Sequence, residues 1–95
     1  MKAVCVGHST YDITLPMNEY PAENIKHRLE KHYECGGGPA SNGAYLLAKW
    51  GMDTTIMSVL GNDYYADKII ESFKEIGAET KYLEKRSDHA TSSSY

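Results

Sequence analysis

Two short runs of apolar and β-branched residues, each ending at a glycine, constrain the fold of this chain more than any other feature. Residues 3–6 end at Gly7, and residues 54–60 end at Gly61. Continuous apolar runs of this length are typical of strands that are buried on both faces of a parallel sheet. Both runs are therefore predicted to be strands of one buried sheet.

Helical spacing of apolar residues appears after the glycines at 36–38 and again after Gly61. The first predicted helix begins at Pro39, and Gly51 supplies its stop; the second is capped by Asn62 or Asp63 and ends at Gly77. Their apolar stripes are Ala40, Ala44, Leu47 and Ala48 in the first helix, and Ile69, Ile70, Phe73 and Ile76 in the second. Strands that alternate with helices predict parallel pairing with right-handed crossovers, and residues 80–83 supply a third candidate strand.

Three more polar segments do not fit that buried sheet. Residues 13–15 are briefly strand-like, residues 28–35 alternate with period two, and residues 91–95 form a polar strand candidate. The glycines at 36–38 are expected to break the second of these strands. We expect the three segments to form a small separate layer at the edge of the main sheet.

The glycine run that enters the first helix is the strongest candidate binding feature. Consecutive glycines let a ligand approach the backbone closely, and the first N–H groups of a helix are unpaired donors. Asn42 lies in the first turn, where its amide can donate to and accept from the same ligand. A tight turn without a ligand is the alternative interpretation. A P-loop is excluded because Ala44 stands where its lysine is required, and a dinucleotide fingerprint because Ser41 replaces its third glycine.

Composition excludes several classes of function. The net charge is −3, whereas nucleic-acid and polybasic membrane binding both need clustered positive charge. No window is apolar enough for a secretory signal or a membrane span. The two cysteines, Cys5 and Cys35, do not make a disulfide framework, which predicts a reduced, cytoplasmic protein. The histidines lack a tight ligand partner, so no metal site is expected.

At residues 37–44, Gly-Gly-Pro-Ala-Ser-Asn-Gly-Ala, followed by Gly51 and Gly61, the sequence resembles the N-terminal signature of the PfkB, or ribokinase-like, carbohydrate kinases. Other stretches agree: residues 7–12 resemble the opening strand of the family with its sugar-binding aspartate, residues 59–63 its V-G-x-D stretch, and residues 90–92 the start of a later lid strand. The resemblance spans the whole chain, with every piece in the expected order.

This resemblance implies that residues 1–95 are the N-terminal part of a doubly wound parallel α/β sheet with a small β lid, formed by residues 10–16, 28–35 and 90–95. Asp12 would then bind sugar hydroxyls, with Thr10 beside it. The backbone of Gly37 and Gly38 and the amide of Asn42 would contact the same sugar. Thr10 and Pro39 stand where ribokinases usually have asparagine and lysine, which argues against ribose as the substrate.

The resemblance also implies that the catalytic aspartate, in a G-A-G-D motif, lies beyond Tyr95. The full-length parent would use ATP and Mg²⁺, while this chain is expected to bind neither and to be inactive alone. Its expected partner is a small-molecule sugar of unidentified type. The alternative is a non-catalytic module that binds a sugar or assembles as a homodimer through the lid or an exposed sheet edge. A small dinucleotide binder is a third interpretation, which the glycine spacing disfavours.

Overall fold

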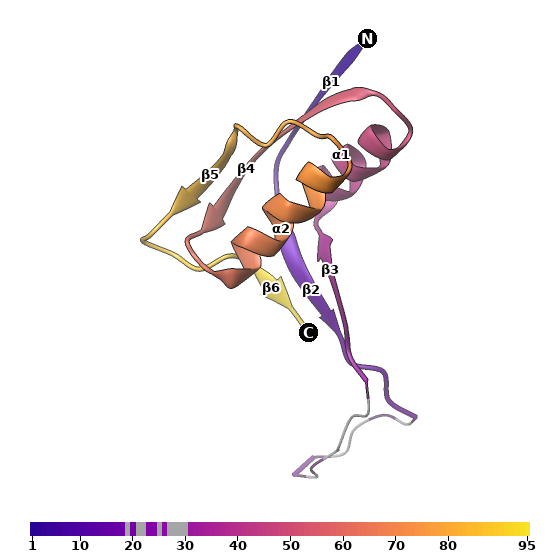
Figure 1. Cartoon of the computed structure of the whole chain (residues 1–95). Coiled ribbons are helices and arrows are strands. Elements are labelled where there is room, and N and C mark those ends of the chain that lie inside the picture. Colours follow the sequence, from indigo (N-terminus) through magenta and orange to yellow (C-terminus); the bar gives the residue numbers. More distant parts are fainter. Residues whose placement is uncertain (19, 21–22, 25, 27–30) are drawn as a thin grey trace.

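The order of helices and strands is that of a parallel α/β protein with an added small sheet (Figure 1). In the computed structural model, which describes residues 1–18, 20, 23–24, 26 and 31–95, the elements are β1 (Lys2–Val6), β2 (Thr10–Thr14), β3 (Tyr33–Gly37), α1 (Pro39–Lys49), β4 (Asp53–Gly61), α2 (Tyr64–Glu75), β5 (Leu83–Arg86) and β6 (Ser93–Ser94). No helix among these residues is long and apolar enough to cross a membrane.

The main sheet contains three parallel strands in the order β1-β4-β5. The predicted parallel α/β architecture is therefore confirmed. Both helices pack on β4: the buried core joins Ile56 and Leu60 of β4 with Ala44 of α1 and with Ile69 and Phe73 of α2. Apolar stripes on the two helices thus cover one face of the sheet, as their helical spacing predicts.

The other face of the main sheet is not covered by the residues that the structure describes. Val4 and Val6 of β1 are 59% and 71% exposed, and Met57 and Val59 of β4 are also exposed. The expectation that residues 3–6 and 54–60 are buried on both faces is wrong for this chain. Side chains alternate between the faces of a strand, and only one of these faces meets a helix.

The third strand of the main sheet begins later than the sequence suggests. Residues 80–83 were the expected strand, but β5 starts at Leu83. Before it the backbone turns, with Leu83 N donating to Thr80 O at 3.1 Å and Lys81 N donating to the Glu79 carboxylate at 2.9 Å. These local hydrogen bonds form a turn before β5, so that only Tyr82 O contacts β4 there, accepting from Ser58 N at 3.3 Å.

Three polar segments form a second sheet in the order β3-β2-β6, with β3 antiparallel and β6 parallel to β2. Within the expected strand 28–35, residues 28–30 lie outside the described residues. The strand also continues through Gly36 and Gly37, which pair with Tyr11 and Thr10. The expected break therefore comes at the last of the three glycines, because the chain turns at Gly38, where φ is +92°.

Helix α2 lies between the two sheets. On the side that faces the small sheet, the Tyr65 ring stacks on Tyr11 of β2, with ring centroids 4.9 Å apart and planes 15° from parallel. Tyr11 and Ile13 are both buried in the same cluster as the core of the main sheet. The small sheet is consequently packed onto the main core through one face of β2.

Candidate functional site

Asp12 lies against the glycine-rich strand, on the side of β2 that faces away from α2. Thr10 Oγ1 donates a hydrogen bond to Asp12 Oδ1 at 2.7 Å, and Gly37 pairs directly with Thr10. A Cβ at position 37 would overlap Asp12 Oδ2 and lie 2.9 Å from Thr10 Oγ1. The structure therefore brings Thr10, Asp12 and Gly37 together, and a side chain at position 37 would displace the carboxylate.

The turn from β3 into α1 is pressed against the segment between β1 and β2. A Cβ at Gly38 would lie 2.6 Å from the backbone oxygen of His8. Beside it, Ser41 Oγ donates to Ser9 Oγ at 2.6 Å, and both serines are buried. Gly38 is required here both for its positive φ and for this close approach.

Helix α1 begins without a side-chain cap and has no acidic residue in its first turn. Its first backbone N–H groups have no partner within the helix, and such groups favour hydroxyl or anionic ligands. The Asp12 carboxylate complements them, because it can accept hydrogen bonds from hydroxyl groups. Acceptor and donor groups of this kind are what recognition of a polyhydroxylated molecule requires.

Asn42 lies in the first turn of α1, where its backbone N–H makes the helical bond to Gly38 O at 2.9 Å. Asn42 is exposed and borders a cavity of about 520 Å³ that Gly36 of β3 and Phe73 of α2 also line, so this cavity lies beside α2 and does not include Asp12. In the part of the chain that the structure describes, its amide makes no hydrogen bond with Asp12. The role of Asn42 as a ligand thus stays a prediction.

Free thiols and potential metal ligands are scattered. Cys5 is half-buried and Cys35 is exposed, and both are unpaired. Among the described residues, no three His, Cys, Asp or Glu side chains gather as metal ligands. His27, one of the four histidines, lies outside the described residues.

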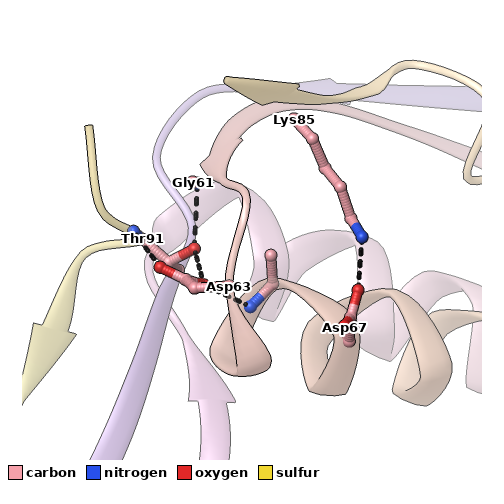
Figure 2. A network of polar contacts seen from close by, with 6 residues as sticks. Gly61, Asp63, Asp67, Lys85 and Thr91 are labelled. Carbon is pink, nitrogen blue, oxygen red and sulfur yellow. Dashed lines mark hydrogen bonds and ion pairs between the residues drawn. The ribbon is translucent and has the colours of Figure 1, made fainter. Parts of the chain in front are cut away.

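One polar cluster was only half predicted from the sequence. Asp63, one of the two predicted caps, caps α2 by accepting from Ala66 N, but the same carboxylate also accepts two hydrogen bonds from Thr91 (Figure 2). Burial raises the pKa of Asp63, and the hydrogen bonds from Thr91 and Ala66 outweigh it, so that the pKa lies below its usual value. Nothing in the local sequence around Thr91 signals this contact.

A second missed cluster is aromatic. Tyr65 contacts Tyr11 by stacking, and its hydroxyl lies 3.4 Å from that of Tyr95. The contact with Tyr95, aided by burial, raises the pKa of Tyr65 to about 12. Tyr11 also donates a hydrogen bond to Glu34 at 3.3 Å. These tyrosines connect β2, α2 and the segment after β6.

Comparison with known proteins gives consistent matches over the whole chain. The family model described as pfkB family carbohydrate kinase matches residues 1–95. A ribokinase of Staphylococcus aureus (strain COL) is 32% identical over 99% of this chain, and a nucleoside kinase of Methanothermobacter thermautotrophicus is 23% identical over 97%. The solved structure of Arabidopsis thaliana ribokinase complexed with ribose and ATP superimposes with a TM-score of 0.84, at 23% identity, over 97% of this chain.

Each of these matches involves only part of the other protein. The chain spans 31% of the length of the staphylococcal ribokinase and 30% of that of the archaeal nucleoside kinase. It likewise covers 30% of the Arabidopsis chain. The chain therefore matches roughly one third of the length of each of these proteins.

Proposed function

Because the chain belongs to the pfkB family of carbohydrate kinases, we propose that it supplies the acceptor-binding part of an ATP-dependent sugar kinase. The parent protein transfers the γ-phosphoryl group of ATP to a hydroxyl of a sugar or of a sugar-containing molecule such as a nucleoside. The names of its relatives, a ribokinase and a nucleoside kinase, support this class of acceptor.

The observation that carries this proposal is the cluster of Thr10, Asp12 and Gly37. Thr10 donates a hydrogen bond to one oxygen of the Asp12 carboxylate. The other oxygen, Oδ2, is left to accept a hydrogen bond from a hydroxyl of the sugar that receives the phosphoryl group. The absence of a side chain at Gly37 gives the carboxylate its place against the strand. The backbone of Gly37 and Gly38 and the amide of Asn42 complete the acceptor site, and the small sheet β3-β2-β6 acts as its lid.

The described residues do not fit a magnesium–nucleotide site, because they bring together no group of carboxylates that could hold the ion. We therefore assign ATP, Mg²⁺ and the catalytic aspartate to other residues of a longer protein, in keeping with the 31% of the staphylococcal ribokinase that this chain spans. The chain alone then binds the acceptor without turnover. We place the parent in the cytoplasm, where the free thiols of Cys5 and Cys35 stay reduced.

Calorimetric titration of the purified chain with D-ribose, D-fructose and adenosine tests the proposal. We expect at least one of them to bind, and Asp12→Asn to weaken that binding about tenfold or more, because hydrogen bonds to a charged group are the stronger ones. Asp88→Asn, at an exposed position, is the matched control. Binding that Asp12→Asn leaves unchanged would contradict the assignment, and ADP production by the chain alone would contradict its inactivity.

A second candidate function is self-assembly, which the uncovered sheet face favours. Val4, Val6, Met57 and Val59 expose apolar side chains on one side of β1 and β4. Light scattering over a wide concentration range tests this alternative: a homodimer that Val6→Ser weakens would support it. A monomer throughout, with sugar binding intact, would leave the kinase proposal alone.

A further inference from the structure

The Asp63 carboxylate joins two segments that are distant in sequence, the start of α2 and the residues before β6 (Figure 2). Oδ1 accepts from Ala66 N at 2.9 Å and from Thr91 Oγ1 at 2.7 Å, while Oδ2 accepts from Thr91 N at 2.9 Å. Thr91 Oγ1 in turn accepts from Gly61 N at 2.9 Å. Both carboxylate oxygens of Asp63, and both the backbone N–H and the hydroxyl of Thr91, thus make hydrogen bonds.

The Thr91 side of this contact is tightly packed and buried, and Asp63 is half-buried. Thr91 is 5% exposed, and Gly61 is buried at the end of β4. A Cβ at Gly61 would overlap Thr91 N and lie 2.7 Å from His89 O. Buried polar groups cost free energy when a partner is removed, so the segment at Thr91 is held in one place as long as Asp63 accepts from it.

Thr91 leads directly to the strand that flanks Asp12. Ser92 O accepts from Tyr11 N at 2.9 Å, and Ser94 of β6 is in register with Asp12. Strand β6 has only two residues, both exposed, so its own pairing with β2 is short. The three hydrogen bonds of Thr91 with Gly61 and Asp63 tie the residues before β6 to the main core.

We propose that Asp63 is a positioning residue for the acceptor site: its carboxylate fixes Thr91, Thr91 fixes β6, and β6 fixes the strand that carries Asp12. This inference rests on the proposed role of Asp12 in acceptor binding. It goes beyond helix capping, because a cap needs one acceptor oxygen, whereas the link to Thr91 N needs the second. A carboxylate offers both oxygens as acceptors, and an amide does not.

This difference makes Asp63→Asn a sharp test. The asparagine keeps the size of the side chain and remains a good helix cap, but it turns an NH₂ group toward the N–H of Thr91. Thr91→Val, which removes the hydroxyl from the other side, is the second variant. The controls are Thr91→Ser, which retains the hydroxyl, and Asp67→Asn, which removes a neighbouring acid of α2 that pairs with Lys85 instead.

The readout is amide hydrogen exchange, followed by NMR on the isotope-labelled chain. Tyr11 N, bonded to Ser92 O, reports on β6, and Gly7 N, bonded to Met57 O at 3.1 Å, reports on the main sheet. We expect Asp63→Asn and Thr91→Val to speed exchange at Tyr11 roughly tenfold more than they speed exchange at Gly7. Thr91→Ser and Asp67→Asn should behave as the unaltered chain does.

Unchanged exchange at Tyr11 in both test variants would overturn the inference, and so would equal acceleration at Tyr11 and Gly7, which indicates general destabilisation. Titration with the acceptor found for the unaltered chain is the second arm, in which we expect Asp63→Asn to weaken binding and Asp67→Asn to leave it unchanged. Because exchange needs no ligand, failure of D-ribose, D-fructose and adenosine to bind would count against the proposed function, while the exchange result would still decide the anchoring of β6.

Discussion

The Asp12 carboxylate occupies the space that a side chain at position 37 would need. Residues 36 and 37 are both glycine and both belong to β3, yet only a Cβ at position 37 would meet Asp12 and Thr10; at Gly36 nothing lies within 4 Å. The two neighbouring glycines therefore differ in their relation to the candidate site.

Gly37→Ala is expected to push the Asp12 side chain away and break its hydrogen bond with Thr10. The folded state should tolerate this change, because the group that must move is a side chain. We expect acceptor affinity to fall about tenfold or more, whereas Gly36→Ala should leave it unchanged. The carbon-13 shift of the Asp12 carboxyl group reports the displacement directly, and an equal loss of affinity in Gly36→Ala would contradict this account.

Gly38→Ala is expected to destabilise the fold more than Gly51→Ala. Both glycines have φ near +90°, at 92° and 91°, so both substitutions carry a backbone cost of about 1–2 kcal/mol. At Gly38 the new Cβ also meets the His8 backbone oxygen at 2.6 Å, whereas Gly51 faces open space. We expect urea unfolding to show about 1–3 kcal/mol more destabilisation for Gly38→Ala. Equal destabilisation by the two substitutions would mean that the backbone near His8 moves aside at no cost in stability.

The stability of the chain should decrease in acid partly through Asp63. Its pKa is lower in the folded state than in the unfolded chain, so the folded state binds this proton less readily. The contribution of Asp63 to the free energy of unfolding is complete above the unfolded pKa, near 3.9, and is lost as the pH falls through the lower pKa of the folded state.

Asp63→Asn should therefore lower the free energy of unfolding at neutral pH by roughly 1–2 kcal/mol, and the difference from the unaltered chain should shrink in acid. Urea unfolding across the acid range measures it. A difference that stays constant down to the lowest pH would show that the charge on Asp63 contributes nothing.

Tyrosine titration tests the contact between Tyr65 and Tyr95. The pKa of Tyr65 is raised to about 12 by the neighbouring Tyr95 hydroxyl and by burial. Because the folded pKa exceeds the unfolded value near 10, this contribution to stability is complete below pH 10 and is lost as the pH rises toward 12. Tyr95→Phe should bring the pKa of Tyr65 down toward 10, as followed by NMR of ring-labelled tyrosine. An unshifted titration would refute the contact.

Sequence patterns correctly predicted the elements that depend on interactions between residues close in sequence. Asp63 as a cap and the stripe of Ile69 and Phe73 identified α2 correctly, because capping and helical spacing act within a few residues. The continuation of β3 through Gly36 and Gly37 was not predicted, because glycine ordinarily weakens a strand. Glycine is needed at position 37 because the Asp12 side chain of the neighbouring strand occupies the space of a Cβ there. That reason exists only once β2 and β3 are paired.

Contacts between distant segments could not be predicted from composition and spacing. The partner of Asp63 is Thr91, and the partner of Tyr65 is Tyr11; neither pair shares a helix or a hairpin. The family resemblance placed Asp12 beside Gly37 and named both as site residues, whereas the exposed face of Val4 and Val6 depends on which elements are present to cover it.

The pairing of β2 with β6 has a consequence for the order of folding. Asp12 lies near the start of the chain, and its neighbour Ser94 lies near the end of the described sequence. During synthesis β1, β4 and the two helices are available before β6 emerges from the ribosome, so β2 waits with one edge unpaired until almost the whole segment has been made. Contacts of such large sequence separation form slowly. The candidate site is therefore expected to be the last part of this segment to mature, and a chain released before Thr91 would carry Asp12 on a strand that lacks one neighbour.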